Sequence, residues 1–200
     1  MFKEIAHPGS VIITDDPMRA KMLTAHHLEH AALMHEQGDE LVYFGGYGGT
    51  TIAVVSAGFE SGAIPEFVRA IEGSGVREIL YIGACTGTTV RHTLGTVILA
   101  HGGSKILLSR ARSAAARYGI KTVVEAVQPG GSGQDVRSSV ADDVTAGLYK
   151  QALIGDIDAL SVLTVSENVI TGEKLEQHVV SSRFYAAARL VFETFAVVPM

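Results

Sequence analysis

The sequence predicts an α/β fold: a mixed, largely parallel central sheet flanked by helices on both faces. Short apolar runs alternate along the chain with longer amphipathic segments, the pattern of strands joined by crossover helices. The 22 glycines outnumber the 5 prolines, which favours tight turns between packed elements rather than a disordered chain. A length of 200 residues suits a single domain spanning residues 1–200.

The expected strands are short apolar runs bounded by turn-forming residues. They cover residues 11–13, 41–44, 51–55, 79–82, 96–100, 122–127 and 159–165. The second and third runs flank the glycine-rich segment 45–49, which predicts a β-hairpin.

The expected helices cover residues 18–36, 63–72, 107–118, 138–153 and 173–195. Asp16 is expected to cap the first helix, with Pro17 as its first residue. Residues 128–137, rich in glycine, are expected to form one long flexible loop. Four histidines fall on the first predicted helix, at positions 26, 27, 30 and 35. The pair at 26 and 30 has the spacing of a metal clamp, but no third ligand accompanies it, so a solvated or interface face is favoured.

Composition excludes several classes of function. The net charge is −5 and no basic tract is present, which argues against nucleic acid and anionic membranes as partners. No apolar run reaches the ~18 residues of a membrane span, and the start lacks a signal peptide, so we expect a cytoplasmic protein. The single cysteine, Cys85, excludes an internal disulfide, and no metal or cofactor is expected. A charged fraction of only 18% favours a homo-oligomer.

In a parallel sheet, ligands bind at the carboxyl ends of the strands. Polar and glycine residues follow three of the predicted strands there, at 14–17, 83–87 and 166–168. These segments are the expected site.

Four segments carry recognisable motifs. Residues 11–20 read Val-Ile-Ile-Thr-Asp-Asp-Pro-Met-Arg-Ala, residues 47–60 form a glycine-rich hairpin, residues 75–87 run through Tyr-Ile-Gly-Ala-Cys-Thr-Gly, and residues 163–167 read Leu-Thr-Val-Ser-Glu. In order and spacing they resemble the nucleoside phosphorylase family, which includes purine nucleoside and uridine phosphorylases and related nucleosidases. The resemblance covers about residues 10–105 and 140–195. It implies an α/β sandwich that assembles as dimers to hexamers and acts on a nucleoside or its base.

The resemblance also implies a phosphate site, of which this chain retains little. Family phosphorylases bind phosphate through a glycine, two arginines and a serine or threonine. These positions are Asp15, Arg19, Tyr81 and Ala84 in this chain, so only Arg19 matches. Unit charges ~4 Å apart interact by about 4 kcal/mol at an effective dielectric near 20, so a carboxylate at Asp15 opposes phosphate strongly.

Other positions favour water as the acceptor. Nucleosidases of the family carry a water-activating glutamate after the first strand, where this chain has Asp15. The sugar-binding glutamate falls at Val144, with Asp142 or Asp143 as replacements, and the base-protonating aspartate becomes Glu167. The predicted catalytic residues are Glu167 and Asp15; the predicted substrate-binding residues are Arg19, Gly83, Ala84, Asp143, Ser166, Asn168 and Phe59.

Two hypotheses from different classes follow. The first is an enzyme that cleaves the N-glycosidic bond of a nucleoside-like substrate, by hydrolysis rather than phosphorolysis. The second is a degenerate homologue that binds a small ligand or a partner subunit without chemistry. An unrelated α/β hydrolase is disfavoured because the sequence has no Gly-x-Ser-x-Gly elbow.

Overall fold

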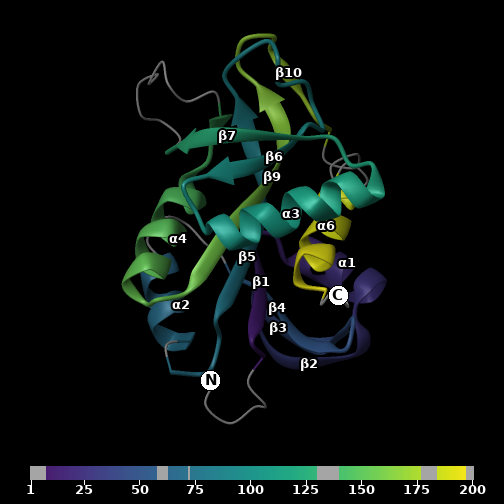
Figure 1. The fold of residues 1–200 in the computed structure, drawn as a ribbon, viewed down its shortest axis with the longest axis vertical. Coiled ribbons are helices and arrows are strands. Elements are labelled where there is room, and N and C mark those ends of the chain that lie inside the picture. Colours follow the sequence, from purple (N-terminus) through teal and green to yellow (C-terminus); the bar gives the residue numbers. More distant parts are fainter. Residues whose placement is uncertain (1–7, 58–62, 72, 130–139, 177–183, 197–200) are drawn as a thin grey trace.

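The protein is described by a computed structural model that covers residues 8–57, 63–71, 73–129, 140–176 and 184–196 (Figure 1). Within these ranges ten strands form one mixed sheet, in the order β10-β9-β6-β7-β8-β5-β1-β4-β3-β2. The strands are β1 (Ser10–Thr14), β2 (Glu29–Gln37), β3 (Glu40–Tyr47), β4 (Thr50–Ser56), β5 (Glu78–Gly87), β6 (Val97–His101), β7 (Thr122–Gln128), β8 (Val140–Ala141), β9 (Asp158–Asn168) and β10 (Glu173–Lys174).

The centre of the sheet is parallel. Strands β4, β1, β5 and β9 lie side by side and run in the same direction. On one side the antiparallel strands β3 and β2 extend the sheet. On the other side β9 also pairs with β6, and β8 joins β7 to β5, so β5-β9-β6-β7-β8 close into a small barrel. The carboxyl ends of β1, β5 and β9 therefore meet at one edge, where a site was expected.

Helices cover both faces of the sheet, as predicted (Figure 1). They are α1 (Pro17–His27), α2 (Ile64–Ile71), α3 (Lys105–Tyr118), α4 (Asp143–Ile154) and α6 (Tyr185–Phe195). Alternate side chains of β1 enter different cores: Val11 and Ile13 pack with α2 and α4, whereas Ile12 packs with α1, α3 and α6. Within the described ranges no helix is both long and apolar enough to cross a membrane.

The predicted hairpin is confirmed. Strands β3 and β4 pair in register from Leu41–Ser56 to Tyr47–Thr50. The turn uses Gly48 and Gly49, whose φ angles of 56° and 79° belong to a turn that matches the twist of two antiparallel strands.

The predicted helix over 18–36 is wrong beyond His27. Leu28 has extended backbone angles and ends α1, and His30, with φ of 51°, cannot continue a helix. Residues from Glu29 onward pair with β3 instead, so pairing between distant segments overrides a local helical pattern. The histidines are consequently divided between α1 and β2, and the helical spacing assumed for a metal clamp does not exist.

Three other boundaries are also corrected. Helix α4 begins at Asp143 rather than at 138, because Val140 and Ala141 pair with β5 and β7. Glu173 and Lys174 pair with β9 rather than starting a helix, and α6 begins at Tyr185. Segments 83–87 and 166–168 belong to the ends of β5 and β9 rather than to loops. Residues 130–137 of the predicted flexible loop lie outside the described ranges.

Candidate active site

The junction of β1 and α1 holds a buried arginine at the carboxyl edge of the sheet. Nη1 of Arg19 donates to Oδ1 of Asp15 (2.6 Å), Oγ1 of Thr14 (2.8 Å) and the carbonyl oxygen of Ile82 (3.4 Å). The guanidinium also lies over the ring of Phe184, 4.1 Å from its centroid. Only 7% of the Arg19 side chain is exposed. Arg19 is thus held by β1, β5 and the start of α6 before any ligand arrives.

The two aspartates on this junction have different roles. Oδ1 of Asp16 accepts hydrogen bonds from the backbone amides of Met18 (2.8 Å) and Arg19 (3.2 Å), and so caps α1 as predicted. Asp15 does not cap; it forms the shorter ion pair with Arg19, and 39% of its side chain is exposed. Asp16 also lies 3.7 Å from Nη2 of Arg19 and is 41% exposed. Solvent therefore reaches both carboxylates, and Asp15 is the one that is not engaged by the helix cap.

Tyr81 and Gly83 form a close-packed pair on β5. A Cβ atom placed on Gly83 would lie 2.1 Å from Oη of Tyr81, so only glycine leaves room for the tyrosine ring. Burial raises the pKa of Tyr81 well above its usual value, and the negative charges of Asp142 and Asp15 add to this rise. Tyr81 is a neutral phenol, and it supplies no cation where the family resemblance placed an arginine.

Cys85 lies two residues further along the same strand and is buried. Burial raises the pKa of its thiol far above the usual value, and Asp142 adds to the rise. The thiol therefore stays protonated, which is the state of a packing residue rather than of a nucleophile.

Asp142 is the acidic residue that α4 brings toward this cluster. It caps α4 by accepting from the amide of Thr145 at 2.8 Å, and it is 8% exposed. Burial raises its pKa, the Asp15 charge contributes in the same direction, and hydrogen bonds from Thr145 oppose them. The predicted sugar residue, Asp143, is exposed on the first turn of α4, and Val144 is buried in the core. The sequence analysis offered Asp142 only as an alternative sugar-binding residue and did not predict its role as a cap, because it started the helix at residue 138.

The end of β9 carries the predicted acid. A bulge leaves Ser166 without a partner residue on β5 and sets Glu167 opposite Thr86. Oγ of Ser166 donates to the carbonyl oxygen of Cys85 at 3.4 Å. The carboxylate of Glu167 is 40% exposed and lies 3.2 Å from the ammonium group of Lys174.

Asn168 follows directly and is fully engaged by the chain. Its Nδ2 donates to the carbonyl oxygens of Thr89 and His92, both at 2.8 Å. Its Oδ1 accepts from the amides of Ile170 (2.9 Å) and Thr171 (3.2 Å). A carboxamide has two donor hydrogens and two acceptor lone pairs, so none is left for the substrate contact that we expected of Asn168.

The structure brings part of the predicted set together. Asp15 and Arg19 meet β5 at Ile82, beside Gly83 and the half-buried Ala84. Glu167 lies on β9, which is two strands away from β1, and it is opposite Thr86, three residues beyond the level of Asp15 on β5. With a strand spacing of ~4.8 Å and a rise of ~3.3 Å per residue, the backbones of Asp15 and Glu167 are roughly 14 Å apart. Side chains on both sides can reach one small molecule across that span. Phe59, also predicted to bind substrate, lies outside the described residues.

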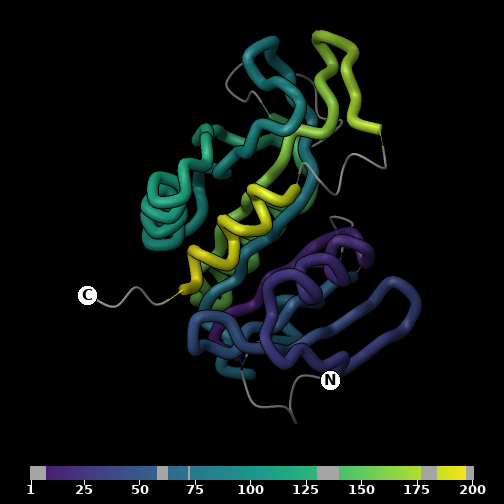
Figure 2. Tube along the Cα trace, turned by 90° about the vertical axis from the view of Figure 1, so that its right-hand side faces the viewer, coloured from purple at the N-terminus to yellow at the C-terminus, as the bar shows by residue number. Residues whose placement is uncertain are grey.

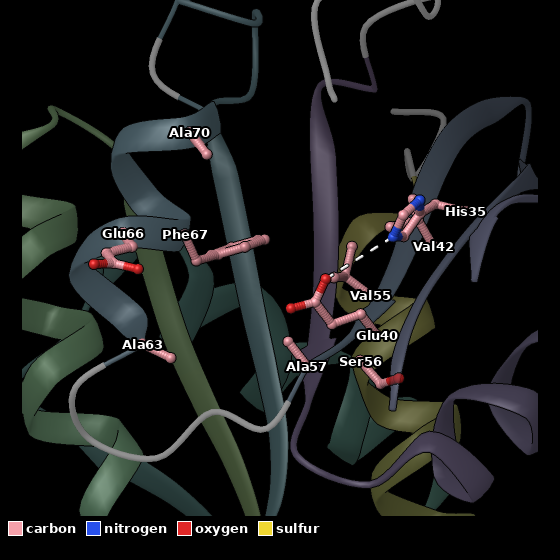
Figure 3. A pocket seen from close by; sticks show the side chains of 10 residues that line it. All are labelled: His35, Glu40, Val42, Val55, Ser56, Ala57, Ala63, Glu66, Phe67 and Ala70. Carbon is pink, nitrogen blue, oxygen red and sulfur yellow. Dashed lines mark ion pairs between the residues drawn. The ribbon is translucent and has the colours of Figure 1, made fainter. Parts of the chain in front are cut away.

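A separate concavity lies between α2 and the β3–β4 hairpin (Figure 3). Its volume is about 270 Å³. Phe67 of α2 faces Val55 of β4 across it, and His35 faces Glu40 with 3.9 Å between Nε2 and Oε2. Ser56 at one end of this pocket is the register partner of Thr14, so the pocket reaches the level of Asp15. No group of three potential metal-ligating His, Cys, Asp or Glu side chains occurs in the ranges that the structure covers.

Comparison with known proteins gives a consistent result at low sequence identity. No protein-family model matches the chain. A DeoD-type purine nucleoside phosphorylase of Alkaliphilus metalliredigens is 27% identical over 216 residues, covering 92% of this chain and 93% of that protein. One of Thermoanaerobacter pseudethanolicus is 26% identical over 203 residues, with coverages of 86% and 87%. The crystal structure of a purine nucleoside phosphorylase from Toxoplasma gondii in complex with immucillin-H matches with a TM-score of 0.84 at 15% identity, over 94% of this chain and 90% of that one. The last likeness is one of fold.

Proposed function

We propose that the chain is a member of the nucleoside phosphorylase family, and that it is an enzyme that cleaves the N-glycosidic bond of a nucleoside with water, rather than phosphate, as the acceptor. The names of the relatives support a purine nucleoside as the substrate. The choice of water departs from those names and rests on the chain's own residues at the β1–α1 junction.

The observation that carries the proposal is the ion pair between Arg19 and Asp15, at 2.6 Å. A phosphate at this junction would have to displace a carboxylate that already neutralises the arginine. At ~4 Å and an effective dielectric near 20, each such pair of charges is worth about 4 kcal/mol, so the repulsion from Asp15 offsets the attraction of Arg19. Tyr81 is a neutral phenol and Ala84 has no hydroxyl, so neither replaces the lost attraction.

The same pair suits Asp15 to hold water. Arg19 fixes Oδ1 of Asp15, while the partly exposed carboxylate can accept a hydrogen bond from a water molecule. Cleavage of a glycosidic bond passes through an oxocarbenium-like sugar, which a water molecule attacks with only modest help from a base. Water adds to C1′ and its proton passes to Asp15.

Glu167 serves the other end of the substrate. As the C1′–N bond breaks, its electron pair stays on the base, and a proton from the Glu167 carboxyl group moves to a base nitrogen. Exchange with solvent then returns both carboxyl groups to their starting states. Glu167 is half-exposed and its pair with Lys174 is open to solvent, so solvent reaches the carboxyl group between turnovers.

The test is the dependence of cleavage on phosphate. We expect the rate in phosphate-free buffer to equal the rate with phosphate, and the sugar product to carry no phosphate. Asp15→Asn should lower kcat by about 10²-fold through loss of the base. Asp16→Asn is the matched control: asparagine caps a helix as well as aspartate, so kcat should change little. A rate that rises and saturates with phosphate, with a sugar 1-phosphate as product, would overturn the proposal and assign phosphorolysis.

A further inference from the structure

Two loops stand side by side at the carboxyl edge of the sheet. One connects β5 to β6, and the other is the β9–β10 hairpin (Figure 2). They are joined at their bases, because the amide of Val169 donates to the carbonyl oxygen of Gly87 at 3.1 Å. Glu167 lies at the base of the second loop, so its position depends on how these loops are held.

Asn168 is the main connection between them. It is 1% exposed, and its Nδ2 reaches across to Thr89 and His92 on the first loop. Its Oδ1 shapes the start of the second loop through the amides of Ile170 and Thr171. One side chain therefore joins the backbone of the first loop to the backbone at the start of the second loop.

The first loop is itself anchored to a third segment. Nε2 of His92 lies 3.1 Å from Oε1 of Glu125 on β7, and His92 is 3% exposed. Asn168 thus ties the end of β9 to a loop that is fixed on the barrel. A polar side chain with every donor and acceptor engaged in a buried position is rigid, because each broken bond would leave a buried group unsatisfied.

We propose that Asn168 is a positioning residue that sets the location of the Glu167 carboxyl group for proton transfer to the base. This inference rests on the proposed function of Glu167. Proton transfer requires donor and acceptor to be within ordinary hydrogen-bond reach, and a displacement of ~1 Å can lower a rate by about 10²-fold. Among the described residues the Glu167 side chain pairs with the exposed Lys174 alone, so the accuracy of its placement depends on its backbone, which pairs with β5 and β10 and is followed directly by Asn168.

The experiment is a double-mutant cycle on kcat, with Asn168→Ala made in the wild-type chain and in Glu167→Gln. In the wild-type chain kcat should fall by about 10- to 100-fold while KM changes by less than about 3-fold. In the Glu167→Gln background the same change should lower kcat by less than about 2-fold, because the group that Asn168 positions has already been lost. An equal fall in both backgrounds would overturn the inference and leave the proposed function intact. No effect of Glu167→Gln alone would overturn the acid role of Glu167, and the inference with it.

Two further variants and one measurement keep the outcome clear if Asn168→Ala folds poorly. Asn168→Asp retains the two acceptor bonds of Oδ1 and loses the donations to Thr89 and His92, and it should reproduce the fall in kcat. Ser74→Ala is the control: Ser74 is 5% exposed and donates to Ile71 at 2.6 Å near the opposite end of β5. It should lower Tm but not kcat, and an equal loss of kcat there would show general loosening instead. The rate of amide hydrogen exchange in Asn168→Asp should rise in residues 87–92 and 166–175. Unchanged protection of these amides would overturn the positioning role without reference to activity.

Discussion

The two ends of the candidate site hold their carboxylates in opposite ways. At the β1–α1 junction the carboxylate of Asp15 is fixed through its own side chain, by an arginine that is 7% exposed. At the end of β9 the carboxylate of Glu167 pairs with the exposed Lys174, and the backbone that follows it is held by Asn168. The side chain of Asp15 is thus held by a salt bridge, whereas Glu167 is held through its backbone.

This difference suits the two tasks proposed for the groups. Asp15 must orient a water molecule before it accepts the water proton, and the bond from Arg19 holds its side chain in place for that task. Glu167 must place its proton within reach of a base nitrogen, so the location of its carboxyl group matters most. The backbone that Asn168 holds sets that location.

The largest expected effect is on the free energy of unfolding, to which the Arg19–Asp15 pair should contribute far more than the Lys174–Glu167 pair. Arg19→Ala should lower the free energy of unfolding by about 2–4 kcal/mol, because it leaves buried Thr14 and the carbonyl oxygen of Ile82 without their donor and removes the stacking on Phe184. For a chain of this size that corresponds to a fall in Tm of about 5–10 °C. Arg112→Ala, an exposed arginine on α3, is the control and should stay within about 0.5 kcal/mol. A fall in the free energy of unfolding no greater than that of Arg112→Ala would show that the interactions of Arg19 do not stabilise the β1–α1 junction.

A smaller effect tests the electrostatic coupling around Asp15. Burial raises the pKa of Asp142 above 3.8, and the Asp15 charge adds to this. The folded chain therefore binds this proton more tightly than the unfolded chain, so the Asp142 contribution favours folding at low pH and is lost as pH rises from 3.8 through the raised pKa. Asp142→Asn keeps the helix cap and removes the charge, so Tm should rise by about 1–3 °C at pH 7.

The control for that prediction is the same variant at pH 3, where the aspartate is protonated and the gain should disappear. A gain of equal size at both pH values would mean that the charge of Asp142 is not responsible. A loss at pH 7 would mean that the charged cap bond to Thr145 outweighs the cost of burial.

Local chemistry accounts for the parts of the structure that the sequence predicted well. The hairpin over 41–55 follows from glycines in a turn that requires positive φ, and the cap at Asp16 follows from an aspartate placed before a proline. Strand β2 could not be found in this way, because it forms only by pairing with β3, and its helix-like pattern competes with that pairing. Position along the chain says little about such pairings until the sheet is assembled.

The site shows the same division. Asp15, Arg19 and Glu167 were predicted as candidates because polar residues at strand ends are visible in sequence. The role of Asn168 was not, because its partners Thr89 and His92 are 79 and 76 residues away. Asp142 was predicted only as an alternative sugar-binding residue, and its role as the α4 cap was not, because α4 begins after β8, a two-residue strand that exists only through its neighbours β5 and β7.

The smallest expected effect sharpens the comparison most directly. Lys174 is 71% exposed and lies 3.2 Å from Glu167, and exposed pairs of this kind contribute about 0–1 kcal/mol. Lys174→Ala should therefore change the free energy of unfolding by less than about 0.5 kcal/mol, in contrast to Arg19→Ala. Because Asn168 rather than Lys174 fixes the location of Glu167, kcat should also stay within about 2-fold of the wild-type value, a change of under ~0.5 kcal/mol in activation free energy. Urea unfolding and steady-state kinetics on the same preparation measure both quantities. A fall in kcat as large as that of Asn168→Ala would show that the lysine, and not the backbone, places the carboxyl group, and the distinction between the two ends of the site would then be lost.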